Sequence, residues 1–266
     1  MTQAQDGSMR SSDDADLARL LRRARRRGLF ESLSRVYADF PETTCDDCAR
    51  CCFESPGIFF VEHLRLIELL AAMPRHRREA LLDRALGELF FSWIEPERQC
   101  IFLESSRCTI YQDRPLACRL FGLVAPEDRD LAEAQARLAA RQEAHRLRLL
   151  GIEIPGAVLQ RSLVSCDRVR DGQGRQVRVD GDAVAARIAH LDAELLPEEV
   201  VVREFCFRSL PERLGAAALG AETIDGMRVQ LLRRAQRGEA TRDLLQLVRR
   251  QARLPASLRQ KKERRR

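Results

Sequence analysis

The feature that most restricts the fold of this chain is the octapeptide CDDCARCC at residues 45–52, which contains four of its nine cysteines. In a reducing cytosol, such a cluster is far more often a metal site or a redox site than a disulfide framework. Nine is also an odd number, so complete pairing within one chain would leave one thiol over. We therefore expect these cysteines to serve a metal or redox site.

The spacing within the octapeptide indicates metal chemistry. Cys45, Cys48 and Cys51 follow one another at intervals of three, which brings their sulfurs to one side of a helix or of successive turns. Zinc knuckles use C-x2-C, and bacterial ferredoxins use C-x2-C-x2-C. The neighbouring side chains of Cys51 and Cys52 should diverge by ~100° on a helix. This divergence favours a polynuclear centre, or two ions close together, over one ion.

Further ligands must come from elsewhere, because a closed thiolate site needs about four ligands per zinc ion. Cys100, Cys108, Cys118 and Cys166 supply four, and the eight cysteines together could hold two tetrahedral ions or one larger cluster. Pro115 is well placed to begin a helix, which would put Cys118 in the first turn, where the helix dipole favours a thiolate. Thiolates bind both zinc and iron-sulfur centres, so both remain open.

Arginines lie near these cysteines in the sequence. Eight thiolates carry more negative charge than two divalent ions neutralise, and hydrogen bonds from guanidinium groups to sulfur would offset part of the excess. We expect Arg114 and Arg119 to lie behind the ligands in this way, with Arg50 and Arg107 as further candidates. The alternative is that these arginines simply face water.

Three separate motifs now resemble a known family. They are Cys45-x2-Cys48-x2-Cys51-Cys52, then Cys100-Ile101-Phe102-Leu103, then Cys108-Thr109-Ile110-Tyr111-x2-Arg114-Pro115-x2-Cys118-Arg119-x-Phe121. In register, they resemble the CxxCxxCC, or YkgJ-like, cysteine-cluster proteins, with a later Cys-Asp step at Cys166. The resemblance implies a zinc- or iron-chelating domain of about eight cysteines. One departure is that some members carry another cysteine in the stretch that corresponds to residues 53–99, where this chain has none.

The resemblance leaves the biochemical role open. The leading hypothesis is a protein that chelates zinc or iron, with an iron-sulfur cluster as one form of the site. Some relatives are flagellin lysine N-methylases, so the first alternative is an iron-sulfur-dependent enzyme that modifies proteins, although motifs alone do not transfer an activity. The second alternative is a metal-stabilised adaptor whose carboxy-terminal helices bind an unidentified protein. Whether the chain is an enzyme is therefore open.

Hydrophobic periodicity predicts a mostly α fold with minor β structure, in which amphipathic helices pack around an irregular, cysteine-rich metal-binding core with short strands. We expect a disordered start and a basic helix (1–40), the cysteine-cluster domain (41–170), a helical region (171–252) and a basic tail (253–266). The expected helices cover residues 16–36, 62–73, 77–93, 127–150, 183–195, 224–237 and 241–254. Short strands are expected at 57–61 and 176–179, with a hairpin or knuckle within 99–121.

Charge and hydropathy narrow the partners. The net charge is +6, and residues 253–266 alone carry seven basic side chains against one acidic side chain, so the remainder of the chain is neutral. This distribution favours a solvated tail over nucleic-acid binding. No apolar run approaches the ~18 residues of a membrane span, so we expect a cytoplasmic protein. Cys206 lies between phenylalanines and is expected to pack as a small hydrophobe.

Overall fold

The computed structural model describes residues 17–44, 48–53, 55–95, 98–160, 166, 168–195 and 208–253. The expected disordered start, Cys45, Cys206 and the tail beyond Arg253 lie outside these ranges. Within them the regular secondary structure is helical apart from one two-stranded sheet, which confirms the mostly α fold with minor β structure. The helical elements are residues 17–26, α2 (Leu29–Ala38), η1 (Arg50–Phe53), α3 (Phe60–Ala72), α4 (Arg75–Phe91), η2 (Tyr111–Asp113), α5 (Leu116–Leu120), α6 (Pro126–Leu149), α7 (Gly156–Leu159), α8 (Gly181–Leu195), α10 (Leu210–Leu219), α11 (Ala221–Gln236) and α12 (Thr241–Gln251).

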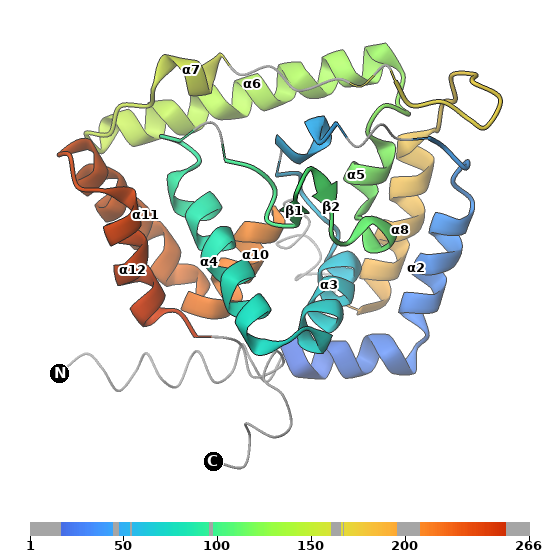
Figure 1. Cartoon of the computed structure of the whole chain (residues 1–266), viewed down its shortest axis with the longest axis horizontal. Coiled ribbons are helices and arrows are strands. Elements are labelled where there is room, and N and C mark those ends of the chain that lie inside the picture. Colours follow the sequence, from blue (N-terminus) through green and yellow to red (C-terminus); the bar gives the residue numbers. More distant parts are fainter. Residues whose placement is uncertain are drawn as a thin grey trace.

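The helices form two adjoining packed groups. Residues 17–26, α2, α3 and α8 enclose one hydrophobic cluster, and α4, α10, α11 and α12 enclose the other. Figure 1 shows α3, α4 and α10 in the middle of the molecule, with the hairpin of β1 (Leu103–Glu104) and β2 (Arg107–Cys108) beside them and α6 crossing one edge. Because α8 packs on α2 and α3, the core joins segments from both sides of residue 170. The division into domains there remains a prediction.

Two expectations near the amino-terminal end are wrong. The helix expected over residues 16–36 is broken at Gly28, whose φ of 64° lies in the left-handed region that glycine adopts without strain. The strand expected at 57–61 is instead the entry to α3. Gly57 makes one isolated bridge to Ser209, and a helix begins at Phe60.

Two buried carboxylates explain why this apolar run enters a helix. Glu62 Oε2 accepts a hydrogen bond of 2.8 Å from the backbone N–H of Phe59. The two carboxylate oxygens of Asp192, on α8, accept hydrogen bonds of 2.7 Å from the N–H groups of Phe60 and Val61. The first N–H groups of a helix have no partner within it, so these acceptors stabilise a helix start where hydrophobicity alone predicts a strand.

The carboxy-terminal half contains two further differences. Residues 176–179 are extended but do not form the expected strand. The Val179 N–H donates one backbone hydrogen bond to the Leu123 carbonyl, and no series of such bonds continues it into a sheet within the described residues. The helix α10 was not expected. Its sequence signal is the capping box of Ser209 and Glu212, in which each side chain accepts from the other residue's backbone N–H.

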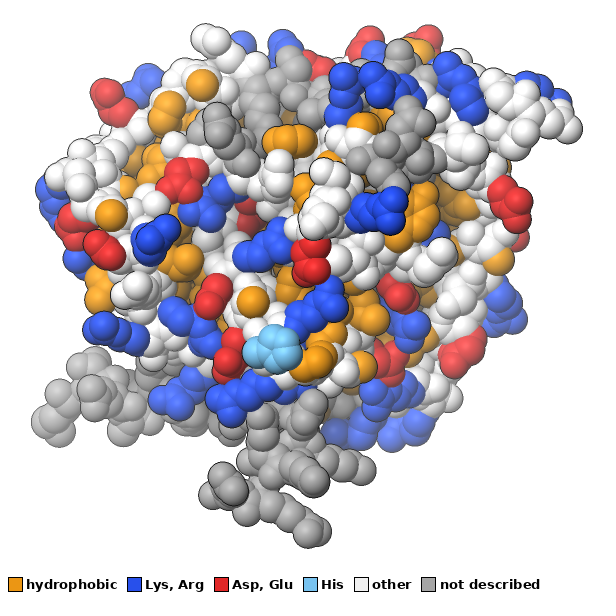
Figure 2. Space-filling model, in the orientation of Figure 1, with side chains coloured by type: hydrophobic (Ala, Val, Ile, Leu, Met, Phe, Trp, Pro, Cys, Tyr) orange, Lys and Arg blue, Asp and Glu red, His pale blue; other side chains and the backbone are white. Residues whose placement is uncertain are grey.

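Charge is mixed on the surface. The space-filling view shows basic and acidic side chains interspersed across this face (Figure 2). Many of the described arginines are paired with a nearby carboxylate, as in the contact of 2.6 Å between Arg249 and Asp83. Among the helices that the structure describes, none has the length and apolar character needed to cross a membrane.

The crossing of α10 and α4 gives a test of the packing. A Cβ atom added at Gly215, on α10, would overlap the buried side chain of Leu89, on α4. We expect Gly215→Ala to lower the free energy of unfolding by about 1–3 kcal/mol through overpacking. Gly226→Ala is the matched control, because Gly226 is exposed on α11 and an added Cβ meets nothing within 4 Å. That substitution should be neutral or stabilising by up to about 1 kcal/mol. Equal effects of the two substitutions in chemical denaturation would contradict this packing.

Candidate metal centre

Five cysteines line one cavity of about 80 Å³. They come from three separate segments: η1, the hairpin with the residues before it, and α5, of which η1 lies far from the other two in the sequence. The remaining wall is largely apolar, with Ile58, Leu66 and Phe102 among its residues. The five are Cys51, Cys52, Cys100, Cys108 and Cys118.

The first segment is a tight turn. Ala49 has a φ of 57°, an uncommon left-handed value for a residue with a side chain, and its carbonyl accepts a 2.9 Å hydrogen bond from Cys52 N–H. The sulfurs of Cys51 and Cys52 lie 3.9 Å apart, so the expected divergence of these neighbours is not found. Rotation about each Cα–Cβ bond can bring adjacent sulfurs together even when the Cβ atoms point apart. The fact that Cys51 and Cys52 are adjacent in the sequence therefore no longer favours a centre with more than one ion.

The second segment is joined directly to the first. The backbone N–H of Cys100 donates a 2.7 Å hydrogen bond to the Cys52 carbonyl. The hairpin then turns through Ser105 and Ser106, whose φ angles of 48° and 63° are those of a two-residue hairpin turn, and it pairs Cys108 with Leu103. The expected hairpin is thus confirmed, and it brings the side chain of Cys108 to the cavity that Cys100 also lines.

An arginine that the sequence did not single out supports this segment. Arg84 Nη2, on α4, donates hydrogen bonds of 2.8 Å and 2.9 Å to the carbonyls of Cys100 and Leu103. Its positive charge also contributes to lowering the pKa of the Cys100 thiol. Nothing in the local sequence distinguishes Arg84 from the chain's many other arginines, because its partners are backbone atoms.

The third segment is the short helix α5. Pro115 is its N-cap, so Cys118 lies in the first turn as expected. The thiolate expected at this side chain remains a prediction, and the environment works against it, because burial raises the pKa of Cys118 and the neighbouring thiols of Cys100, Cys51 and Cys108 raise it further. A helix of one turn does not offset the cost of a buried charge.

Within the cavity, the pKa values of Cys52 and Cys100 are shifted in opposite directions. The pKa of Cys52 is raised, first by its hydrogen bond to Cys100, then by Cys51 and by burial. The same bond lowers the pKa of Cys100, because a donated S–H stabilises a thiolate. Burial raises the pKa of Cys108. Ionisation is therefore favoured at Cys100 and disfavoured at Cys52, Cys108 and Cys118.

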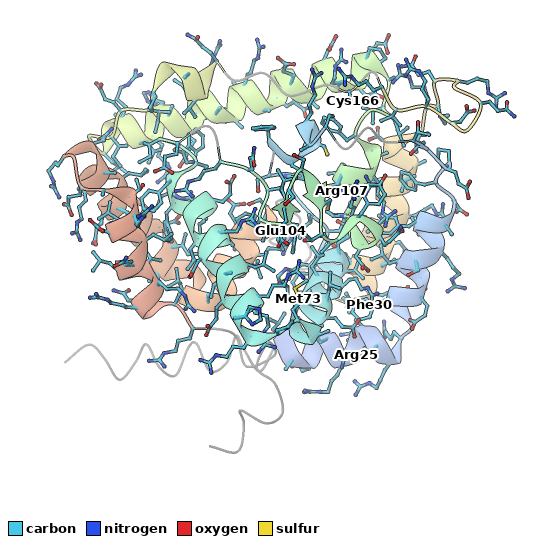
Figure 3. The ribbon with its side chains drawn as sticks, viewed as in Figure 1. Arg25, Phe30, Met73, Glu104, Arg107 and Cys166 are labelled. Atoms are coloured by element: carbon cyan, nitrogen blue, oxygen red, sulfur yellow. The ribbon has the colours of Figure 1, made fainter. Side chains whose placement is uncertain are left out.

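Two other predicted ligands do not line this cavity. Cys48 is exposed, and Cys166 lies beside the chain that leaves α5, where its Cβ is 3.2 Å from the place of a Cβ on Gly122 (Figure 3). Thr44, which precedes the octapeptide, bridges to Arg170, so the segments that lead to Cys45 and Cys166 meet. The ligand roles of Cys45, Cys48 and Cys166 remain predictions.

The two predicted supporting arginines hold the backbone around α5. Arg114 lines the cavity, donates from Nε to the Tyr111 carbonyl at 3.0 Å and stacks 3.6 Å above the Tyr111 ring. Its charge partly offsets the raised pKa of Cys108. Arg119 donates from Nε to the Arg114 carbonyl at 2.8 Å and stacks 4.1 Å above the Tyr37 ring. Contact of either guanidinium with sulfur remains a prediction.

Glu62 is a buried site residue that sequence reasoning missed. In addition to the Phe59 N–H, it accepts a 2.6 Å hydrogen bond at Oε1 from Leu116 N–H, the first residue of α5, and a short hydrogen bond from the Tyr37 hydroxyl. Burial raises its pKa to about 7, although these donors act in the opposite direction. Burial also lowers the pKa of His63 to about 3, so this imidazole is neutral, and it does not line the cavity.

Residues 44–142 match the CxxCxxCC family. The family model is described as a "Putative zinc- or iron-chelating domain". The matched CxxCxxCC segment contains all five cavity cysteines, together with Cys45 and Cys48, whereas Cys166 follows it. No curated protein and no solved structure matches the chain significantly.

The donor set of the CxxCxxCC segment fits the metals named for the family. Thiolate sulfur is the ligand that closed zinc sites and iron-sulfur centres share. Five sulfurs around one largely apolar cavity provide that chemistry. In the described part of the chain, no three His, Cys, Asp or Glu side chains already stand at the spacing of ligands to one ion. Metal binding therefore requires the thiols to lose their protons and to draw together.

The raised pKa of Glu62 gives a pH prediction. Its ordinary value is 4.5, and in the fold it is about 7, so the folded chain holds this proton more tightly than the unfolded chain does. The corresponding stability is fully present below pH 4.5 and is lost as the pH rises through 7, by roughly 3 kcal/mol. With a chelator and a reductant present, we expect the unfolding free energy of wild type minus that of Glu62→Gln to fall as the pH rises from 4.5 through 7. A difference independent of pH would contradict the assignment.

Proposed function

We propose that this chain binds zinc or iron through the thiolates of its central cavity, with Cys51, Cys52, Cys100, Cys108 and Cys118 as the core of the ligand set. The observation that carries the proposal is the convergence of five sulfurs from three separate segments on one cavity. The family match over residues 44–142 supports the choice of metals. Cys45, Cys48 and Cys166 complete the proposed set of eight.

Burial of the thiols connects metal binding to protons. Neutral thiols can crowd together without the repulsion that thiolates would suffer, and the raised pKa values of Cys52, Cys108 and Cys118 are consistent with this. Cys100, whose pKa is lowered, is the thiol that is most readily available as a first ligand. Because each further ligand must give up a proton, the apparent affinity for metal should rise with pH.

A bound metal ion would also connect the fold. One direct contact between two of the three segments is the backbone bond between Cys100 and Cys52. A thiolate-bound ion supplies strong cross-links between its ligands, and in structural zinc sites its binding free energy adds to folding. The role that this supports best is a chelating site whose metal also stabilises the surrounding loops.

Metal analysis of protein purified without oxygen tests the proposal. We expect at least one equivalent of zinc plus iron, and an affinity that falls by about a hundredfold or more in Cys100→Ser and Cys118→Ser, because each substitution removes a thiolate ligand from a site whose stability resides in its ligand bonds. Cys206→Ser is the matched control, since the sequence predicts a packing role for that cysteine. A visible charge-transfer band would identify an iron-sulfur centre, and a colourless protein with zinc would identify a zinc site.

The proposal would be wrong if the purified wild type held less than one equivalent of both metals together and if the cavity variants folded as stably as the wild type. It would also be wrong if Cys206→Ser lost metal to the same degree as Cys100→Ser, because the loss would then not depend on the cavity.

A further inference from the structure

We infer that Glu62 is a positioning residue of the metal centre: its buried carboxylate fixes the start of α5 and thereby sets where Cys118 meets the other sulfurs. The inference rests on the proposed function, because it concerns the same site. Glu62 is not itself among the residues that line the sulfur cavity, so it would act through α5 rather than as a ligand.

The carboxylate joins three helices at one point. Glu62 belongs to α3, the Tyr37 hydroxyl that donates to it belongs to α2, and the Leu116 N–H at 2.6 Å is the first of α5. Cys118 follows two residues after Leu116 in a helix of only five residues. Such a helix has too few internal hydrogen bonds to hold its own position, so external contacts must do so.

A second contact holds the far side of the same turn. Arg119, next to Cys118, stacks on the ring of Tyr37, and the hydroxyl of that tyrosine bonds to Glu62. Cys118 is therefore flanked by two residues, Leu116 and Arg119, that both connect to the Glu62–Tyr37 pair. A small displacement of this pair would move the Cys118 sulfur relative to Cys100 and Cys108.

The contacts of Glu62 use acceptors on both of its oxygens. All three partners of Glu62 are donors: two backbone N–H groups and one hydroxyl. A carboxylate offers acceptors on both oxygens, whereas a glutamine of the same shape would point an NH₂ group at one of these donors. The polar cavity of about 220 Å³ on this side, lined by Glu62, Tyr37 and Arg119, shares only Pro115 with the sulfur cavity. Glu62 therefore acts on α5 from outside the sulfur cavity.

The chain offers a matched control for the experiment. Asp192 is also a buried carboxylate at the start of α3, and it accepts two backbone hydrogen bonds of 2.7 Å. Among the described residues, its hydrogen bonds go to Phe60 and Val61, and none goes to α5. Asp192→Asn should therefore weaken the start of α3 about as much as Glu62→Gln does, while leaving Cys118 in place.

The measurement is titration of the full chain with Co²⁺ under reducing conditions, in competition with a chelator of known affinity. We expect Glu62→Gln to lower the affinity by about tenfold, the lower end for residues that orient metal ligands. We also expect a weaker sulfur-to-cobalt charge-transfer band per bound ion, because Cys118 contributes less. Asp192→Asn should keep the wild-type band, which loss of stability alone does not change.

Each outcome decides a different question. If wild type binds no Co²⁺, zinc or iron, the proposed function fails, and the inference fails with it. If wild type binds metal but Glu62→Gln and Asp192→Asn give the same affinity and band, the positioning role is overturned and the proposed function stands. If Glu62→Gln does not fold, Tyr37→Phe decides, because it removes one donor and keeps both backbone bonds. An unchanged affinity and band in Tyr37→Phe would then overturn the inference.

Discussion

The buried carboxylate of Glu62 is the interaction on which the arrangement around the cysteines depends most. A carboxyl group without solvent is costly unless several donors satisfy it, and here two N–H groups and one hydroxyl do so. These donors come from three different helices, so the cost of burial is offset only when all three are in place. The result is a specific junction between α2, α3 and α5 that apolar packing alone would leave free to slide.

The cysteine segments themselves have little regular structure, so their shape is imposed from outside. Arg84 holds the chain before the hairpin through two carbonyls, and Arg114 and Arg119 hold the turns around α5 through others. Arginine suits this task because its several donors lie in one rigid plane. The abundance of arginine in this chain therefore has a structural use near the sulfurs, in addition to its charge.

The sequence predicted the helical class, the hairpin and the cysteines of the cavity because those features depend on local periodicity and on ligand spacing. It did not predict the helix start at Phe60, because an apolar run is typical of both a strand and a buried helix, and the deciding partner, Asp192, lies 132 residues away. Glu62 and Arg84 were missed for the same reason. Their roles consist of contacts with distant backbone atoms, which no local pattern encodes, whereas the capping box at Ser209 was a local signal that could have revealed α10.

Protonation explains how this chain can gather so many thiols in one place. Five thiolates around a cavity of about 80 Å³ would repel one another strongly, and burial would raise the cost further. In the structure, burial raises the pKa of Cys108 and Cys118, and the interaction between Cys52 and Cys100 raises the pKa of Cys52 and lowers that of Cys100. The fold therefore favours protonated thiols at Cys52, Cys108 and Cys118, and a metal ion would replace protons rather than create the cavity. Because the scaffold of Glu62, Arg84 and the core helices does not itself contain sulfur ligands, it can hold the cysteines near one another before any metal binds.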